Sequence, residues 1–402
     1  MGLAGAGQGN GMGKLTKRKW TSPDGAVKEA WRVDYKDAHG VRRAKQFARK
    51  VDAETYRKRI ERELDDGTHL APSESPTLAD AAERWIEACS LRNWKTSTAK
   101  QMRQHVDHIS RRSIGSVKLS KLTHETVERF AIELVEGTSR PLAKKILTTL
   151  KAILRKAKRG HLVDDVKIKG NSTRKLEVGK DIPMPAEVRA IIEHSKGKWR
   201  VINIVAAFTG LRASELRGLR WSDVDLEGSR LHVRQRADMW REISEPKSDT
   251  SERIIPIGPM VVNTLREWRL ACAQSELGLV FPSNSGSVLA GTKLPSYSLW
   301  PPQIAAGLTV PATYKDGRPK LDANGQPKLQ AKYQGMHTLR HFYASWCINR
   351  PADGGLGLPP KTVQERLGHS DIRITMNTYS HLFPSDDGAE LEAGELALMR
   401  AV

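Results

Sequence analysis

Three short runs near the N-terminus mix polar residues with aromatic and β-branched ones. The runs are KLTKRKW, VKEAWRVDY and VRRAKQF, and turn residues separate them at 22–25 and 37–40. Such runs between turn signals predict a three-stranded antiparallel sheet. The next stretch, AETYRKRIERELDDG, predicts a helix that Asp52 caps and that ends near Gly67.

The middle of the chain repeats apolar residues with the period of an α-helix. The first stripe is Leu78, Ala81, Ala82, Trp85 and Ile86, and a second helix is expected over about 96–110. A third stripe is Val127, Phe130, Ala131 and Leu134. The fourth is Leu142, Ile146, Leu150, Ile153 and Leu154. Four such stripes with polar opposite faces predict a small helical domain.

Two polar stretches divide the chain. A Pro/Ser-rich stretch covers 71–76, and a second stretch covers 169–180. Since such composition marks linkers, we expect a disordered leader over 1–13, a sheet-plus-helix domain over 14–70, a helical domain over 76–170, a linker over 171–182 and a larger domain over 183–402. The predicted fold class is multidomain α+β, in which the last domain is mainly helical with a small β-sheet.

The net charge is strongly positive and unevenly distributed. Lys plus Arg number 66 and Asp plus Glu 46, which gives +20. Residues 14–70 hold 16 basic and 10 acidic residues and residues 77–170 hold 20 and 10, so these two segments contribute (16 − 10) + (20 − 10) = +16. A charged, solvated face explains any single run, but an excess concentrated in two small domains indicates nucleic acid as the partner.

The sequence argues against a membrane protein, an exported protein and a disulfide-bonded protein. No apolar run reaches the roughly 18 to 20 residues that a bilayer span needs. The opening MGLAGAGQGNGMGKL lacks the apolar core of a signal peptide. Cys89, Cys272 and Cys347 form no C-x-x-C pair, which favours reduced thiols. We therefore expect a cytoplasmic protein with no membrane partner.

Four segments of the last domain concentrate basic and hydrogen-bonding residues, whereas the common nucleotide, zinc-protease and serine-hydrolase motifs are missing. The segments are AAFTGLRASELRGLRWSDVDLEG with Arg212, EPKSDTSERIIPI with Lys247, HTLRHFYASW with His337 and Arg340, and RLGHSDIRITMNTYSHLF with His369 and Tyr379.

In this order the four segments resemble the tyrosine recombinase family, the phage integrases and their relatives. The resemblance places the family's catalytic set on Arg212, Lys247, His337, Arg340, His369 and Tyr379. It also implies a core-binding domain over 76–170 and an arm-type DNA-binding domain over 14–70. The partners it implies are double-stranded DNA, a homo-tetramer on that DNA, and, in some members, a host DNA-bending protein and an excision factor.

The chemistry of DNA strand exchange fits these residue types. Tyr379 is the candidate nucleophile, and Lys247 is the candidate acid for the departing 5′ oxygen. Arg212 and Arg340 can present planar guanidinium groups to phosphate oxygens, which an ammonium cannot match bidentately. Free tyrosine has a pKa of about 10, so a base must take its proton; we assign this role to His337 and a hydrogen bond to the phosphate to His369. A 3′-phosphotyrosine link conserves the energy of the broken bond, so no ATP, metal or other cofactor is expected.

Less specific interpretations stay open for individual residues. Arg212 could pair with Glu215 as a buried ion pair, His337 and His341 could form a metal pair with help from His369 or His381, and Tyr379 could be a core aromatic. Tyr343 and Tyr333 are rival nucleophiles by residue type. We assign packing and support to Glu215, Trp221, Asp223 and Asp225, and DNA contact to Lys17, Arg18, Lys19, Arg42 and Arg43.

Three segments of the last domain extend or depart from the family pattern. Residues 314–333 predict an added β-hairpin, and residues 350–360 are rich in Gly and Pro. After Tyr379 apolar residues at helical spacing predict a helical tail, and the family resemblance implies that this tail is exchanged between subunits. The sequence thus predicts a phage or other mobile-element integrase that acts through a Holliday junction. A housekeeping Xer-like recombinase and an inactive DNA-binding regulator are the alternatives.

Overall fold

The computed structural model describes residues 14–23, 25–37, 40–67, 69, 71, 74–91, 94, 96–169, 175–245, 252–314, 317–383 and 399. The chain forms two compact units, Met1–Ser172 and Thr173–Val402. Their boundary lies within the expected linker, and each unit is described by itself below. In the described ranges no helix is both long and apolar enough to cross a bilayer.

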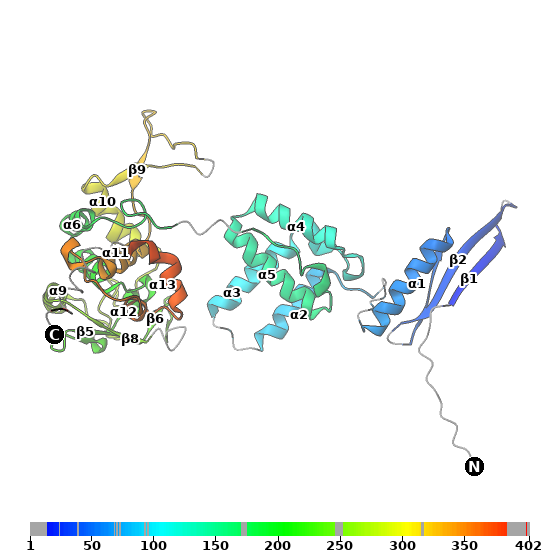
Figure 1. Ribbon diagram of the computed structural model, residues 1–402, viewed down its shortest axis with the longest axis horizontal. Coiled ribbons are helices and arrows are strands. Elements are labelled where there is room, and N and C mark those ends of the chain that lie inside the picture. The colour runs from blue at the N-terminus through cyan, green and yellow to red at the C-terminus, as the bar shows by residue number, and fades with distance from the viewer. Residues whose placement is uncertain are drawn as a thin grey trace, which may run out of the picture. The chain divides into compact units, whose positions relative to one another are not determined.

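The N-terminal sheet has the predicted three antiparallel strands, β1 (Lys14–Thr21), β2 (Val27–Lys36) and β3 (Arg42–Phe47), in the order β1-β2-β3. Helix α1 (Lys50–Asp65) packs on one face of the sheet through Ala53, Tyr56 and Ile60, which meet Val33 and Tyr35 (Figure 1). Alternation along β2 puts Val33 and Tyr35 on the buried face, and this pattern fixes the register of the sheet.

The predicted cap of this helix is wrong. Helix α1 begins at Lys50, three residues earlier than a cap at Asp52 requires, and Arg49 occupies the N-cap position without a side-chain cap. Asp52 lies in the first turn, where its carboxylate accepts hydrogen bonds from the Arg49 side chain at 2.8 and 3.0 Å. A negative charge in the first turn interacts favourably with the helix dipole. Asp52 therefore stabilises the N-terminus of α1 from within the first turn and not as its cap.

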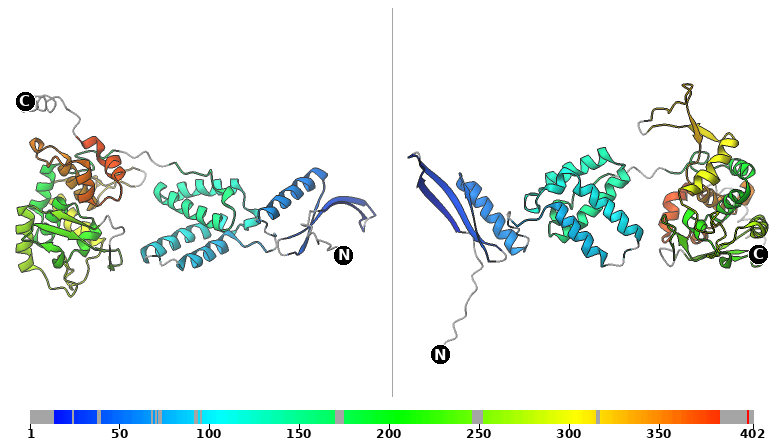
Figure 2. Two further views of the ribbon diagram at one scale, coloured as in Figure 1. Left: turned by 60° about the horizontal axis from the view of Figure 1, so that its bottom comes forward. Right: turned by 180° about the vertical axis from the view of Figure 1, so that it is seen from behind.

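The predicted four helices are present as α2 (Leu78–Ser90), α3 (Thr96–Ser110), α4 (His124–Gly137) and α5 (Arg140–Lys156). Thr77 and Asp80 form a reciprocal capping box at the start of α2. The apolar stripes converge on one core that includes Val106, Phe130 and Leu150. Figure 2 shows these helices gathered around each other, as expected of a small helical bundle.

The C-terminal unit is mainly helical with small β-sheets. Its α-helices are α6 (Pro185–His194), α7 (Gly197–Thr209), α8 (Ala213–Gly218), α9 (Pro259–Ala271), α10 (Trp300–Ala305), α11 (His337–Ile348), α12 (Pro360–Leu367) and α13 (Ile372–Tyr379). Strands β4 (Val224–Asp225), β5 (Arg230–Val233) and β8 (Arg253–Pro256) form one antiparallel sheet, and β6 (Arg236–Ala237) pairs with β7 (Ile243–Ser244). Helices α7 and α11 cross in the core, where Ala206, Tyr343 and Ala344 are buried.

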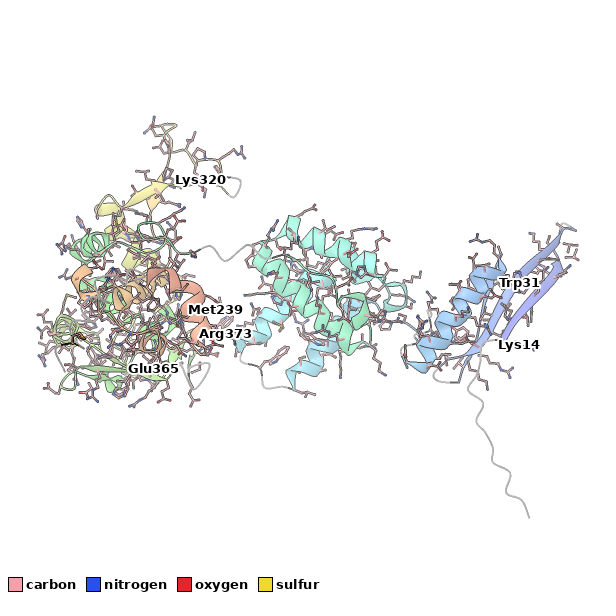
Figure 3. All side chains as sticks on the ribbon, viewed as in Figure 1. Lys14, Trp31, Met239, Lys320, Glu365 and Arg373 are labelled. Carbon is pink, nitrogen blue, oxygen red and sulfur yellow. The ribbon has the colours of Figure 1, made fainter. Side chains whose placement is uncertain are left out.

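The expected added hairpin exists but has different limits. Its base is the antiparallel pair β9 (Thr309–Pro311) and β10 (Leu329–Ala331), and it carries Lys320 outside the body of the unit (Figure 3). Tyr333 belongs to the core: its buried hydroxyl donates to Glu187 at 2.7 Å. The turn residues located the hairpin, but its first strand precedes residue 314.

The Gly/Pro-rich segment 350–360 folds back on the end of α11. A short 3₁₀-helix covers Pro351–Asp353, and the backbone N–H groups of Leu356 and Leu358 donate to the carbonyls of Trp346 and Cys347 at 2.9 and 2.8 Å. The expected leader and nearly all of the C-terminal tail, including 384–398, lie outside the described residues.

Candidate active site

The structure brings together five of the six residues that the motifs single out. Arg212 precedes α8, His337 and Arg340 lie on α11, His369 follows α12, and Tyr379 ends α13. The sixth, Lys247, lies outside the described residues, between β7 and β8. Segments far apart in the sequence therefore supply one site.

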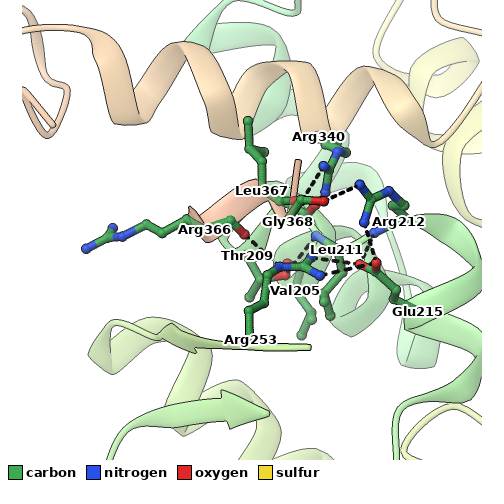
Figure 4. Close-up of polar contacts among 11 residues, drawn as sticks. Val205, Thr209, Leu211, Arg212, Glu215, Arg253, Arg340, Arg366, Leu367 and Gly368 are labelled. Carbon is green, nitrogen blue, oxygen red and sulfur yellow. Dashed lines mark hydrogen bonds and ion pairs between the residues drawn. The ribbon is translucent and has the colours of Figure 1, made fainter. Parts of the chain in front are cut away.

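A buried carboxylate organises two arginines at this site. Glu215 accepts from Nη1 of Arg212 at 2.7 Å and from Nη2 of Arg253 at 2.8 Å, and it also accepts from the backbone N–H of Arg212 at 2.9 Å (Figure 4). Burial alone would raise the pKa of Glu215, but the Arg253 and Arg212 charges outweigh it and lower the pKa to about 2. Glu215 is therefore an anion at every physiological pH.

The same arginines bind the carbonyl groups at the end of α12. Nη2 of Arg212 donates to the carbonyl of Gly368 at 2.8 Å, and Nε of Arg253 donates to that of Arg366 at 2.8 Å. Gly368 adopts a left-handed conformation with φ of 62°, and a Cβ there would lie 2.9 Å from Nη1 of Arg253. Glycine therefore allows α12 to end against the arginines.

Arg340 joins the ends of α7 and α12. Nη1 of Arg340 donates to the carbonyl of Gly210 at 2.6 Å, and Nη2 donates to the carbonyl of Leu367. The side chain is almost fully buried, and burial followed by the Arg212 charge lowers the pKa of Arg340 to about 9. Its partners are neutral carbonyls, so the guanidinium keeps an uncompensated positive charge at neutral pH.

We call Arg212, Arg253, Arg340 and Glu215 the arginine cluster. Three guanidinium groups and one carboxylate leave a net charge of 3 − 1 = +2 within the cluster. Arg212 is the most accessible of the three arginines, with 32% of its side chain exposed against 6% for Arg253. The cluster is thus a fixed site for an anion, with Arg212 at its surface.

Histidine side chains lie next to the arginine cluster. His337 is exposed to solvent, and its ring meets the edge of His341 with the ring centroids 4.7 Å apart. Nδ1 of His369 lies 2.9 Å from Oγ1 of the buried Thr375, which orients the ring. Partial burial, followed by the charges of Arg340 and Arg212, lowers the pKa of His369 to about 3.

The Tyr379 hydroxyl is buried against a histidine that the motif-based assignment passed over. Oη of Tyr379 lies 2.7 Å from Nδ1 of His341, whereas the His369 ring stacks 6.5 Å from the Tyr379 ring between centroids. Burial raises the pKa of Tyr379 to about 12, and the Arg340 charge opposes that rise. His341, and not His337, therefore contacts the hydroxyl.

The residues assigned to packing and support differ in their contacts. Glu215 forms the ion pair that the sequence left open, and it does so within the site. Asp223 is buried and Trp221 stacks with the Arg269 guanidinium, with 5.5 Å from the ring centroid to Cζ. Asp225 accepts from the backbone N–H of Gly228 at 2.7 Å. Nothing in the sequence pattern distinguished Arg253 from other arginines.

The rival tyrosines are placed elsewhere. Tyr343 packs against Gly210, where an added Cβ would lie 2.3 Å from its Cδ1. Tyr333 holds Glu187 as described above. In the described ranges no group of three or more His, Cys, Asp or Glu side chains could hold a metal ion.

The basic residues expected to contact DNA lie on the N-terminal sheet. Lys17 and Lys19 point to the same side of β1, and each Nζ lies 2.5 Å from a carboxylate oxygen of Glu29. These two hydrogen bonds lower the pKa of Glu29. Arg18 alternates to the other face. Ion pairs this exposed contribute little, so both lysines can exchange Glu29 for another anion.

Arg42 and Arg43 begin β3 and differ in their surroundings. Arg42 is exposed. Nε of Arg43 donates to Asp37 at 2.9 Å, and its Nη2 donates to Glu74. Arg43 therefore links the β2–β3 turn to the segment that follows α1 through these two carboxylates.

Comparison with known proteins agrees with the architecture. A model described as the phage integrase family matches residues 184–385. The chain is 26% identical over 384 residues to a protein named tyrosine recombinase XerC-like from Caldanaerobacter subterraneus subsp. tengcongensis, covering 89% of this chain and 93% of that protein. It is also 26% identical over 361 residues to an integrase of Streptomyces ambofaciens, covering 82% of each.

Solved structures share the fold at low identity. The Tn1549 transposon integrase in complex with a circular intermediate DNA matches with a TM-score of 0.58 at 18% identity, covering 80% of this chain and 100% of that one. A lambda integrase tetramer bound to a Holliday junction matches with a TM-score of 0.53 at 18% identity, covering 88% and 95%. With the family match over half of the sequence, the chain belongs to the phage integrase family of tyrosine-type site-specific DNA recombinases.

Proposed function

We propose that this chain is the integrase of a phage or another integrative element. It cleaves and rejoins DNA strands through a 3′-phosphotyrosine and a Holliday junction, without metal or ATP. The observation that carries this proposal is the convergence of Arg212, Arg340, His369 and Tyr379 from separate segments around a cluster of net positive charge.

The arginine cluster supplies the electrostatic part of the reaction. The transition state of phosphoryl transfer carries negative charge on the nonbridging oxygens, which fixed guanidinium groups stabilise without reorganising. Glu215 and the carbonyls of Gly210 and Gly368 hold Arg212 and Arg340 in place. In this proposal Arg212 contacts the phosphate from the accessible side, and the charge of Arg340 acts from beneath.

The remaining groups carry protons and form the covalent bond. Oη of Tyr379 attacks phosphorus as a histidine of the site takes the hydroxyl proton, and the bond from phosphorus to the 5′ oxygen breaks. Lys247 protonates that oxygen, and His337 and His369 hydrogen-bond to the phosphate. Reversal by a 5′ hydroxyl of another strand restores the DNA backbone and releases Tyr379.

Double-stranded DNA is the proposed partner, and four protomers on two duplexes are the proposed assembly. A tetramer on a Holliday junction is what the lambda integrase structure contains. The N-terminal sheet favours an integrase with arm-type sites, because Lys17, Arg18, Lys19 and Arg42 give it a basic surface. A host DNA-bending protein and an excision factor complete the proposed set of partners.

The experiment that tests this function needs no knowledge of the DNA site. The protein is incubated with fragmented DNA from the organism that encodes it, denatured, and assayed for DNA attached covalently to protein, beside a Tyr379→Phe variant and a Tyr343→Phe control. We expect adducts at one sequence for the wild type and the control and none for Tyr379→Phe. Tight DNA binding without adducts would instead favour the inactive regulator.

The sequence of the trapped DNA separates the two recombinase roles. Ends located at the boundary of an integrated element support the integrase. Ends at a single chromosomal site with no such element support the housekeeping alternative, with which the XerC-like relative also agrees.

A further inference from the structure

The contact between His341 and Tyr379 joins two helices at the site. His341 lies on α11 directly after Arg340, and Tyr379 ends α13, yet Nδ1 and Oη are 2.7 Å apart. This distance is typical of a strong hydrogen bond to a hydroxyl. Tyr379 is only 1% exposed, so His341 provides the hydroxyl with a partner in place of water.

We propose that His341 is a further catalytic residue, which orients the Tyr379 hydroxyl and accepts its proton as the tyrosine attacks DNA. The proposal rests on the proposed function, since it requires Tyr379 to be the nucleophile. It moves the role of base from His337, where the sequence pattern put it, to the residue four positions later on the same helix.

The geometry favours His341 over the two other histidines. The edge of His337 meets the His341 ring, which places His341 between His337 and the tyrosine. Nδ1 of His369 is already engaged with Thr375, and its ring is stacked nearly parallel to that of Tyr379, at 8°. The centroids of these two rings are 6.5 Å apart, whereas the 2.7 Å contact with the hydroxyl comes from His341.

The chemistry requires a base at this position. A phenol whose pKa is raised to about 12 is almost entirely protonated at neutral pH, and attack by the neutral hydroxyl is slow. In the proposed step the Oη–P bond forms, the bond from phosphorus to the 5′ oxygen breaks, and the phenol proton passes to Nδ1 of His341. The departing oxygen takes a proton from Lys247, so the atoms and charges balance.

The surroundings keep His341 ready to accept that proton. Partial burial, followed by the nearby His337 and Arg340, lowers the pKa of His341 to about 4, so its ring is neutral before DNA binds. A phosphate at the arginine cluster brings negative charge, which raises the pKa of an imidazole beside it. DNA binding would thus make His341 a stronger base when it is needed.

The test compares His341→Asn with the wild type. The Asn side chain can accept a hydrogen bond near the position of Nδ1 but cannot take a proton. We expect the initial rate of adduct formation on fragmented genomic DNA to fall about 100-fold or more, in line with the loss of a general base, while DNA binding is unchanged. The matched control is His194→Asn on the exposed part of α6, which should react at the wild-type rate.

Rescue separates a base from a structural support. Incorporation of 3-fluorotyrosine at position 379 makes the phenol more acidic and reduces its need for a base. We expect it to recover at least tenfold of the rate lost in His341→Asn. A variant that reacts within about threefold of the wild type, or a loss that the fluorinated tyrosine leaves unchanged, contradicts the proposal.

Two further readouts keep the outcomes distinct. Adducts formed by Tyr379→Phe, or no adducts from the wild type, would overturn the proposed function and with it this inference. With Tyr379 established as the nucleophile, a normal rate in His341→Asn overturns the inference alone. If His341→Asn fails to fold, nitrogen NMR of labelled histidines replaces it: Tyr379→Phe should shift the Nδ1 signal of His341 and leave that of His194 unchanged, and no shift contradicts the contact.

Discussion

Replacing Glu215 by Gln should destabilise the C-terminal unit strongly, although the two side chains have nearly the same shape. Glu215 is 4% exposed and lies between the guanidinium groups of Arg212 and Arg253. The substitution keeps one acceptor oxygen, removes the charge and points an amide N–H group toward a cation. The buried guanidinium of Arg253 then loses the carboxylate that it contacts at 2.8 Å, and removing one partner is the costly way to break a buried ion pair.

The pKa of Glu215 gives the size of the effect. The surroundings lower it from 4.5 to about 2, and each unit of pKa corresponds to roughly 1.4 kcal/mol. The site therefore prefers the charged carboxylate by about 3 kcal/mol, which agrees with the roughly 3–5 kcal/mol known for broken buried pairs. We expect the free energy of unfolding to fall by about this amount.

Urea unfolding followed by circular dichroism and tryptophan fluorescence measures the change. With slopes of about 1–3 kcal/mol per molar urea, the midpoint of the C-terminal unit should fall by about 1 M or more. Glu227→Gln is the matched control, because the Glu227 side chain is 93% exposed and pairs with Arg266 at the surface. Equal midpoints for the two variants would refute the role of Glu215 as the anion that holds the arginine cluster.

Three other predictions follow from single contacts. Gly210→Ala should lower the free energy of unfolding by about 3 kcal/mol, since φ is 62° and the new Cβ would meet Tyr343 at 2.3 Å. Gly354→Ala, at φ of 77° with open space around it, should cost about 1 kcal/mol, and equal losses for the two variants in urea unfolding would contradict the clash with Tyr343. The folded-state pKa of His369 is about 3 against 6.5 for the free side chain, so only the unfolded chain takes up that proton as pH falls. Stability should therefore decrease from pH 6.5 toward pH 3, and the decrease should be shallower in His369→Gln; equal slopes would argue against this burial. Lys19→Gln should weaken DNA binding and reduce the slope of log affinity against log salt by about one, as fluorescence anisotropy over a salt series would show; an unchanged slope would mean that Lys19 does not contact phosphate.

Local patterns identified most of the elements. The 3.6-residue period located α2 to α5, and the turn residues located the strands of the N-terminal sheet, because each signal arises within a few neighbouring residues. The cap of α1 was misplaced for a related reason. Asp52 is a good capping residue by type, but the helix extends to Lys50, where nothing in the local pattern marks the start.

The site was predicted as a set of motifs but not as a set of contacts. Motif order identified Arg212, Arg340 and Tyr379, and the structure brings them together. The contacts of His341 with Tyr379 and of Arg253 with Glu215 each join residues 38 positions apart. Such pairs depend on how α11, α13 and β8 pack, and no periodicity along the chain encodes them. The spacing of His337 and His341 left a metal pair open as an alternative, because helical spacing alone does not show what a side chain faces.

The central claim is that Tyr379 forms the covalent bond to DNA, and mass spectrometry of the trapped adduct tests it most directly. Nuclease removes all but a short 3′-phosphate-linked remnant, and trypsin then releases the peptide that begins at Ile374, in which Tyr379 is the only tyrosine. We predict the mass of the nucleotide remnant on Tyr379. The same mass on Tyr343, on Tyr333 or on a serine would contradict the account, as would a wild-type protein that binds DNA and carries no nucleotide.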